Sequence, residues 1–425
     1  MARIAIVGTG IAGLGCAYFL RNRHELTLFD HGNYVGGHTN TIAVKQGHQE
    51  VSFDTGFMVF NKVTYPHLTR LFDKLEVAIQ PTSMSFSVQH RPTALEFCGS
   101  SINHLFAQRR NIFRPGYWHF LTQISRFNRE AAETLEKSLH LEDTVAEYVE
   151  AKGYGEAFLN YFLIPMSSAV WSTPPDKMLK FPITSLLRFF HNHGFLGLHT
   201  QHPWFSIQGG SQKYVRKILS LLPNDCIKLE CGVLKVRRKS NGVELTLNNG
   251  ASATFDKVIL ACHADQSLKI LDEASAREVG CLDKFHYQPN QVTVHTDILV
   301  MPQRKLCWAS WNYRIDSVPG QSRASTHYWM NSLQGLSQTT NYFVSLNYED
   351  QISPEKVLRR IHYEHPLFDL SAMQAQKDLS AINRQHPDQT IYFCGSYTRY
   401  GFHEDGLASA VDVSSILLQQ DPWTS

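Results

Sequence analysis

The chain has 425 residues, 43% of them hydrophobic and 18% charged, which is the composition of a globular protein too long for one ordinary core, so we expect two domains. Its formal net charge is +2 without a long run of one sign, which leaves nucleic-acid binding without support. Its eight cysteines include no CxxC pair and its 21 histidines no HExxH spacing, so we expect no metal site, no disulfide framework and a cytoplasmic location.

The first thirty residues predict a strand, a helix and a second strand in close succession. A β-branched apolar run predicts the first strand over 4–7, and apolar residues at helical spacing predict a helix over 14–20. A second strand over 26–29 stops at an acidic residue, Asp30. A unit of this kind is typical of dinucleotide-binding domains.

The turn after the first strand has the GxGxxG spacing, and each glycine has a physical role. Gly8 permits the tight turn, Gly10 lets the backbone approach a pyrophosphate, and Gly13 lets the helix lie close to the strand. The helix start offers N–H groups and a positive dipole end to phosphates. Asp30 is placed to accept hydrogen bonds from a ribose, so the pattern predicts dinucleotide binding.

Two further segments indicate a flat, FAD-like ligand. Gly36 and Gly37 follow Asp30 in the register that FAD enzymes of the glutathione-reductase-like superfamily use, and NAD dehydrogenases usually lack this pair; a plain loop is the alternative. Downstream, a strand within 49–61 leads into Asp-Thr-Gly at 54–56 and then aromatic residues, which suits a backbone that passes close to a ring system. A buried turn is the alternative there. A helix is expected over 65–75.

The segment from 81 to 204 has a different character. Short strands over 84–88 and 94–98 precede helices over 117–140 and 141–152. Aromatic and basic residues alternate at Phe106, Arg109, Arg110, Phe113, Arg114, Tyr117, Trp118 and Phe120. Such a mixture suits an anionic membrane surface, and an ordinary helical subdomain is the alternative. The apolar stretch 183–195 suits either the wall of an acyl channel or a packed core.

The chain then returns to the first domain and leaves it again. A Gly-Gly-Ser turn precedes a helix over 212–222, followed by strands over 227–230, 233–237, 243–247 and 257–261 with Asn-Gly hairpin turns. From 288 to 380, strands over 291–295, 306–312, 325–330 and 342–347 suggest an antiparallel sheet that walls a substrate cavity. The candidates for that wall, with ordinary packing as the alternative, are Trp308, Trp311, Tyr313, Tyr328 and Trp329.

The C-terminal segment repeats the order of strand, glycine turn and helix found at the N-terminus. A strand over 390–394 ends at Gly395 and Ser396, and Gly406 precedes a helix over 407–418. We expect the N–H groups at that helix start to face the electron-rich edge of a reduced flavin.

Taken together, GTGIAGLG, GGHTNT, the Gly-Gly-Ser helix, the strands around Val233 and FCGSYTRYGFHEDGLASA resemble the flavin amine oxidase, phytoene desaturase and protoporphyrinogen oxidase superfamily. The resemblance implies an α/β fold: a discontinuous, glutathione-reductase-like FAD-binding Rossmann domain over 1–80, 205–287 and 381–425. An inserted α+β substrate domain is expected over 81–204 and 288–380.

The resemblance also implies which residues hold the cofactor, FAD. The first glycines and Asp30 correspond to the contacts of the ADP half, the backbone of Val233 to an adenine contact, and the late glycines to the pyrophosphate, ribityl chain and isoalloxazine. The residues expected at FAD are Gly8, Gly10, Ala12, Gly13, Asp30, His31, Gly36, Gly37, His38, Thr39, Thr55, Gly56, Phe57, Val233, Gly395, Ser396, Gly406 and Leu407.

Within the superfamily, FDTGFMVFN, HTDILVMP, CWASWNYR and GFHEDGLAS look like a bacterial branch that includes methyl fatty acid desaturases of furan fatty acid synthesis. They are also similar to the N-terminal flavin portion of plant cyclopropane fatty acid synthases. This implies dehydrogenation of an apolar, fatty-acyl or phospholipid-bound acyl substrate by hydride transfer to FAD. A peripheral contact with the inner membrane and a lipid methyltransferase as a partner are further expectations.

Four positions depart from true amine oxidases. Leu407 stands where many of them carry an aromatic cage residue, and Asn290, Gln291 and His295 lie in the region where they carry a lysine. His38 replaces an arginine and Ser396 an acid. The first two departures disfavour an amine substrate, and the last two leave FAD binding altered but intact.

Proton removal from a substrate needs a base, and three residues near the late glycines are candidates: Tyr400, His403 and Glu404. Helix capping or flavin contact is the alternative for all three. Two competing functions remain open, a small-amine oxidase or dehydrogenase and a flavin-bearing partner of a lipid methyltransferase that has no turnover of its own.

Overall fold

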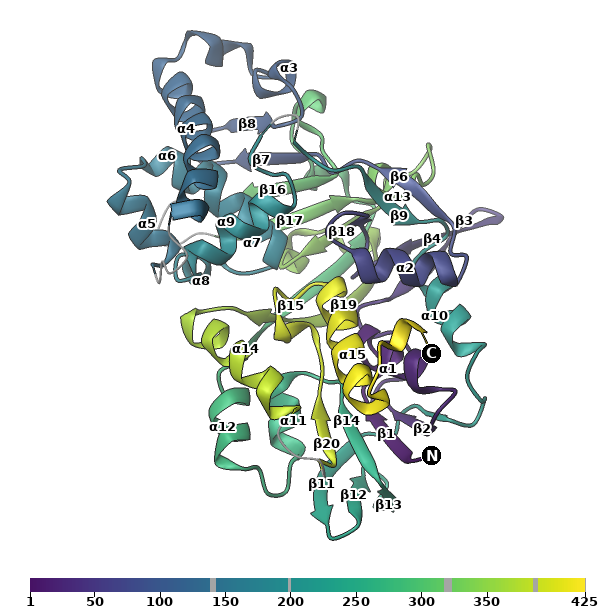
Figure 1. Ribbon diagram of the computed structural model, residues 1–425. Coiled ribbons are helices and arrows are strands. Elements are labelled where there is room, and N and C mark those ends of the chain that lie inside the picture. Colours follow the sequence, from purple (N-terminus) through teal and green to yellow (C-terminus); the bar gives the residue numbers. More distant parts are fainter. Residues whose placement is uncertain (138–142, 198–199, 317–322, 385–388, 425) are drawn as a thin grey trace.

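The computed structural model describes residues 1–137, 143–197, 200–316, 323–384 and 389–424. It has a mixed α/β fold. Figure 1 shows a part that carries both termini and a parallel sheet, and a second part built from a larger sheet with helices at its far end. Within the described ranges, no helix combines the length and the apolar content that crossing a bilayer requires.

The parallel sheet has five strands in the order β10-β2-β1-β14-β20, and every pair of neighbours is parallel. Its strands come from three distant parts of the chain: β1 (Arg3–Val7), β2 (Glu25–Phe29), β10 (Ile227–Lys228), β14 (Lys257–Leu260) and β20 (Ile391–Phe393). This sheet is the Rossmann core that the sequence predicts, and its apolar strands are buried because helices cover its faces.

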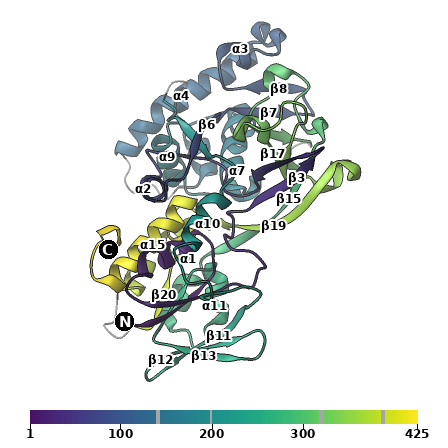
Figure 2. The ribbon, with the colours of Figure 1, turned by 90° about the vertical axis from the view of Figure 1, so that its right-hand side faces the viewer.

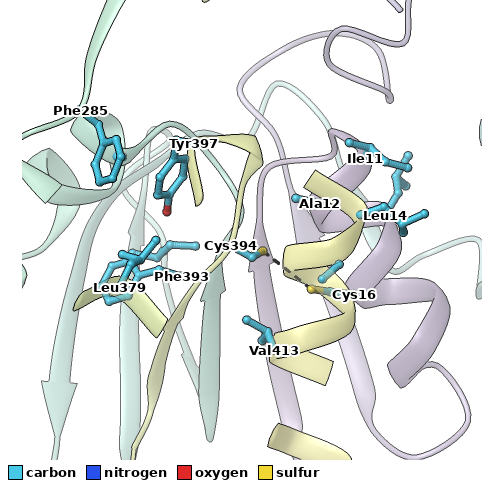
Figure 3. Close-up of a cluster of buried hydrophobic side chains, with 14 of the residues drawn as sticks. Ile11, Ala12, Leu14, Cys16, Phe285, Leu379, Phe393, Cys394, Tyr397 and Val413 are labelled. Atoms are coloured by element: carbon cyan, nitrogen blue, oxygen red, sulfur yellow. Dashed lines mark hydrogen bonds between the residues drawn. The ribbon is translucent and has the colours of Figure 1, made fainter. Parts of the chain in front are cut away.

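Two helices from opposite ends of the chain pack side by side on this sheet (Figures 1 and 2): α1 (Ile11–Leu20) and α15 (His403–Leu418). All ten residues of α1 are buried. A Cβ added at Gly15 would lie 2.8 Å from Cβ of Ala410, so the two helix axes approach as closely as glycine allows. In the core that they share with the sheet, the Sγ atoms of Cys16 and Cys394 are 3.8 Å apart (Figure 3).

The second large sheet has seven strands in the order β19-β15-β18-β17-β16-β7-β8. Its members are β7 (Phe86–His90), β8 (Leu95–Cys98), β15 (His286–His295), β16 (Trp311–Ile315), β17 (Ala324–Trp329), β18 (Phe343–Leu346) and β19 (Val357–Leu367). The pairs are antiparallel, as expected, except that β16 and β7 are parallel. That parallel pair joins the two expected parts of the substrate domain.

Three smaller sheets complete the strands. β11 (Val233–Lys239), β12 (Gly242–Leu247) and β13 (Ser252–Phe255) form two consecutive hairpins at the expected Asn-Gly turns. β3 (Thr41–Gln46) pairs with β4 (Gln49–Asp54), and β9 (Trp204–Ile207) pairs with β5 (Phe60–Asn61) and β6 (Ile79–Thr82).

The remaining helices are α2 (Pro66–Lys74), α3 (Ile102–Leu105), α4 (Pro115–Lys137), α5 (Val145–Ala151), α6 (Glu156–Phe158), α7 (Ile164–Trp171), α8 (Pro175–Met178), α9 (Ile183–Asn192), α10 (Gln212–Leu219), α11 (Ala264–Ile270), α12 (Ala276–Leu282), α13 (Met330–Gln334) and α14 (Leu370–Ile382). The helices predicted over 117–140 and 141–152 extend into 138–142, which lies outside the described residues. The other parts of both predictions fall on α4 and α5.

Several element predictions were wrong. The strand over 306–312 is replaced by a 3-10 turn, Lys305–Cys307, and the strand starts only at Trp311, because the indole N–H of Trp308 donates to the carbonyl of Pro302 and closes the turn. The sequence prediction also lacks many other elements, among them the strands β3, β6, β9, β13 and β19 and the helices α7, α11, α12 and α14. β19 has a weak apolar signal because it lies at the edge of its sheet and exposes charged side chains.

Candidate functional site

The GxGxxG turn contains one glycine fixed by packing and one that faces open space. A Cβ added at Gly13 would lie 2.0 Å from the carbonyl oxygen of Gly8, so no side chain fits there. A Cβ added at Gly10 would have no atom within 4 Å. Gly10 begins α1, and among the described residues no side chain caps that helix start. An uncapped helix N-terminus beside empty space fits the pyrophosphate of FAD.

Asp30 lies at the end of β2 with its carboxylate held in place. Its Oδ2 accepts hydrogen bonds from the backbone N–H (2.9 Å) and the hydroxyl (2.5 Å) of Thr9, and its Oδ1 accepts from the N–H of Gly32 (2.8 Å). A carboxylate offers about four acceptor positions, so one position on Oδ1 remains for a ribose hydroxyl.

The segment before Val233 lies beside the loop that follows β2. The backbone N–H of Cys231 donates to the carbonyl of Asp30 (2.8 Å), and a Cβ added at Gly232 would lie 3.3 Å from Cβ of His31. The structure therefore brings Val233 and His31 to the same side of Asp30, where the adenine contacts are expected.

The Gly-Gly pair touches the first glycine turn. A Cβ added at Gly37 would lie 3.2 Å from Cα of Gly10. The next segment closes over this pair, since a Cβ added at Gly56 would lie only 2.2 Å from the carbonyl oxygen of His38. Residues 36–39 and 55–57 thus form one surface against the first turn.

The C-terminal glycine turn reaches the same place. A Cβ added at Gly406 would lie 2.8 Å from Cγ2 of Ile11 and 3.8 Å from the backbone nitrogens of Ala12 and Ser396. The neighbouring Gly395 donates its N–H to the hydroxyl of Ser409 (2.9 Å). The two glycine turns, from the two ends of the chain, therefore lie together as the sequence predicts.

His403 lies half-buried in this region. Its Nε2 is 2.7 Å from the hydroxyl of Tyr214, which is in turn 2.6 Å from the hydroxyl of Thr39. The ring of His403 stacks on Phe57 with centroids 3.9 Å apart. Burial lowers the pKa of His403 to about 3.

The first turn of α15 holds two carboxylates that serve helix starts. Glu404 accepts hydrogen bonds from the backbone N–H groups of His67 and Leu68, both at 2.9 Å, and so caps α2. Asp405 accepts from the N–H groups of Tyr400 and Phe402 and caps α15 itself. Burial raises the pKa of Glu404 to about 7 and that of Asp405 to about 6.

These contacts change two expectations. The helix predicted over 407–418 begins at His403, because Gly406 sits inside its first turn, pressed against α1. The helix start that was expected to offer a positive end to the flavin therefore carries the acidic groups of Glu404 and Asp405. The capping contacts of Glu404 favour the structural alternative for that residue.

Two positions compared with amine oxidases also have structural explanations. Cδ1 of Leu407 lies against Gly15, so this side chain belongs to the interface between α1 and α15, and its aliphatic nature says nothing about a cage. Asn290 is buried, with its Nδ2 within 3.2 Å of the carbonyl of Ser172 and 2.9 Å from Nδ1 of His365.

An aromatic cluster that the sequence reading missed connects the helices of the substrate part to the start of α15. Phe189 of α9 stacks on Phe402 (4.8 Å), contacts Trp171 of α7 (4.7 Å) and stacks on His193 (3.8 Å). The indole N–H of Trp171 donates to the carbonyl of Tyr400. The apolar run over 183–195 was the sequence signal, but only the fold shows its partner.

The five aromatic candidates for a cavity wall divide between the two faces of the seven-stranded sheet. Trp311 packs on Tyr328 (4.8 Å), with Tyr313 on the same face, whereas Trp308 packs on Trp329 on the other. The buried hydroxyl of Tyr313 and indole N–H of Trp311 have no hydrogen-bond partner in the described structure.

Comparison with known proteins identifies the family and the fold. A model of the flavin-containing amine oxidoreductase family matches residues 11–418. Cyclohexylamine oxidase from Brevibacterium oxydans superposes with a TM-score of 0.69 at 13% identity, covering 98% of this chain and 99% of that one. A CLA-producing fatty acid isomerase from P. acnes superposes with a TM-score of 0.67 at 13% identity, covering 98% of both chains.

A curated relative is prenylcysteine oxidase 1 of Mus musculus, 27% identical over 201 residues, which span 41% of this chain and 39% of that protein. The structural neighbours share the fold at low sequence identity, whereas the family model covers nearly the whole chain and rests on the sequence itself. The chain belongs to the flavin-containing amine oxidoreductase family, and this protein is therefore a flavin-dependent oxidoreductase.

Proposed function

We propose that the protein dehydrogenates an apolar, fatty-acyl or phospholipid-bound acyl chain. The observation that carries this proposal is the charge state of the region around the start of α15. Three carboxylates lie there, and each is committed to a helix start: Glu404 to α2, Asp405 to α15, and Asp54 to α10 through the N–H and hydroxyl of Ser211. Within the described residues of this region, none of the three is left to receive an ammonium group.

The histidines of the same region are uncharged. Burial lowers the pKa of His403 to about 3 and of His365 to about 4, and it holds the pKa of His38 well below its usual range. A region of neutral imidazoles, aromatic rings and satisfied carboxylates suits an alkyl chain, because an uncompensated charge in it would be costly.

The names of two similar proteins support a lipid substrate. One is a prenylcysteine oxidase and the other a fatty acid isomerase. The motif resemblance to methyl fatty acid desaturases points the same way.

Bound FAD supplies the acceptor for a hydride. The chain's own contribution is to hold the cofactor at Gly10, Gly37 and Asp30 and to provide a route for the proton. We place His403 first among the three base candidates, since its Nε2 contacts the hydroxyl of Tyr214, which in turn contacts the hydroxyl of Thr39. Glu404 comes last, because both of its oxygens already accept hydrogen bonds.

The test is an anaerobic titration of the FAD-loaded protein with acyl lipids and with small amines such as cyclohexylamine, followed through the flavin absorbance. We expect acyl lipids to bleach the flavin and to lose two hydrogen atoms by mass spectrometry. Bleaching by amines alone would replace the proposal with an amine oxidase. If no substrate bleaches the flavin and a lipid methyltransferase co-purifies, the non-catalytic partner function is correct instead.

The base assignment has its own test. His403→Ala should slow flavin reduction by acyl lipid while leaving the FAD content unchanged. Equal reduction rates in the wild type and this variant would remove His403 as the base. Glu404→Gln serves as the matched control, since its expected effect is on stability.

A further inference from the structure

We propose that the end of the helical region around Phe113 is a docking surface for an anionic lipid bilayer. The surface is formed by α3, the 3-10 turn Arg109–Phe113 and the first turns of α4. We define the docking surface by its exposed apolar and basic side chains: Ile102, Arg109, Arg110, Ile112, Phe113, Arg114 and Trp118.

The apolar members are unusually exposed for their type. Phe113 is 84% exposed, Ile102 69%, Trp118 48% and Ile112 43%. These four belong to a group of fourteen exposed large hydrophobic side chains in the described chain, and they fall within one stretch of 17 residues. Clustered exposure of this kind marks an interaction site rather than scattered surface residues.

The exposed side chains are held on a packed platform. The indole N–H of Trp118 donates to the carbonyl of Ile112 (2.8 Å), and the hydroxyl of Tyr117 donates to the carbonyl of Leu105 (2.7 Å). Beneath them lies a separate buried cluster made of Val88, Phe97, Phe106, Tyr117 and Phe120. The surface is therefore presented in a fixed conformation and needs no rearrangement to bind.

The positive charge of the docking surface favours an anionic partner. The sequence from 97 to 129 contains five arginines and no aspartate or glutamate. Arg109 donates to the carbonyl of Phe106 and to Oδ1 of Asn103, and Arg110 donates to the carbonyl of Ala94. Among the described residues, no carboxylate forms an ion pair with Arg109, Arg110 or Arg114, so their charge stays available for anionic headgroups.

The combination of exposed apolar side chains and arginines favours a bilayer over other binding partners. Aromatic and aliphatic side chains beside arginines match the boundary between acyl chains and headgroups. A nucleic acid would leave the apolar side chains in water. A second copy of the same surface would place its arginines against like charges.

The position of the docking surface deepens the proposed acyl function without depending on it. Figures 1 and 2 both place α3 at the end of the molecule opposite the two termini and the parallel sheet. The surface belongs to the same helical part that carries α7 and α9, whose aromatic cluster reaches the start of α15. Docking would hold the substrate side of the protein against the source of an acyl lipid.

The experiment is flotation of the FAD-loaded protein with vesicles. It measures binding without turnover, so its result does not depend on which substrate the enzyme oxidises. We expect binding to vesicles of equal parts phosphatidylcholine and phosphatidylglycerol, little binding to phosphatidylcholine alone, and weaker binding at high salt. Replacing Arg109, Arg110 and Arg114 together by Gln should weaken partitioning roughly a hundredfold. The double change Phe113→Ser and Trp118→Ser should weaken it about tenfold or more.

Leu234→Ser is the matched control, because Leu234 is 60% exposed on β11, at the other end of the molecule. It should bind vesicles like the wild type, and retained FAD absorbance shows that each variant is folded. Absent binding of the wild type to anionic vesicles, or equal binding of all variants, overturns the proposal. So does a dimer that dissociates on the Phe113→Ser and Trp118→Ser change, since the occupant would then be a second copy.

Discussion

The starts of α1 and α15 lie together in the structure, yet they are built in opposite ways. α1 begins at Gly10 with no acidic residue in its first turn and, within the described chain, no capping side chain. α15 begins with Glu404 and Asp405 in its first turn, and Asp405 caps it from within. One helix start carries no acidic group, whereas the other carries two carboxylates, which disfavour an anion there.

This difference separates two roles that the sequence pattern presents as equivalent. The uncapped N–H groups and positive dipole end of α1 suit a phosphate. α15 contributes its packing against α1 and, through Glu404, the start of α2. A glycine near a helix start therefore suits an anion only where the first turn of that helix carries no carboxylates.

The largest effect is expected at Gly13, where the start of α1 packs against the glycine turn. Gly13→Ala would place a methyl carbon 2.0 Å from the backbone oxygen of Gly8, and neither backbone can move without breaking the turn. We expect a loss of at least about 4 kcal/mol in the free energy of unfolding, measured by urea denaturation. The matched control is Gly280→Ala in α12, where an added Cβ meets nothing within 4 Å and stability should rise by about 0.5–1 kcal/mol. A stable Gly13→Ala variant would contradict the close helix–turn packing.

The acidic start of α15 predicts a pH dependence. The pKa of Glu404 is raised to about 7 from 4.5, so the folded protein holds a proton there that the unfolded chain releases. Its contribution is fully present below pH 4.5 and is lost as the pH rises to 7, an effect of up to about 3 kcal/mol.

The difference in unfolding free energy between the wild type and Glu404→Gln isolates this group from the buried histidines. That difference should shift against the wild type as the pH rises over this interval. A difference that stays constant with pH would show that Glu404 is not titrating in this way.

The open start of α1 predicts a change in binding without a change in fold. Gly10→Ala adds a methyl group to empty space at a backbone conformation that alanine adopts readily, so unfolding without FAD should be unchanged. The methyl group would occupy the expected pyrophosphate position, and FAD affinity should fall by about tenfold or more, measured by flavin fluorescence. Wild-type affinity in this variant would move the phosphate site elsewhere.

The smallest expected effect belongs to the internal cap of α15. Asp405→Ala removes the acceptor for the N–H groups of Phe402 and Tyr400 and should cost about 1 kcal/mol of stability. FAD affinity should change little, which is the reverse of the Gly10→Ala result. A large loss of FAD with unchanged stability would erase the distinction between the two helix starts.

The sequence predicts those parts of this site whose residues lie close together along the chain. The first strand, the glycine turn and Asp30 lie within thirty residues, and their spacing alone predicts a dinucleotide fold. The start of α15 was placed four residues late because Gly406 resembles a helix boundary, whereas its actual cause is the close approach to Ile11, some 400 residues away in sequence. The contacts of Glu404 with α2 and of β7 with β16 likewise depend on distant partners, which no local period reveals.

The packing of α15 against α1 has a consequence for how the protein is made. Edge strand β20 and helix α15 are synthesised after the other strands of the parallel sheet. The first glycine turn therefore lacks its contact with α15 until the last part of the chain has been made. We therefore expect flavin capture to follow the synthesis of α15, and a nascent chain that stalls before residue 403 should emerge without colour.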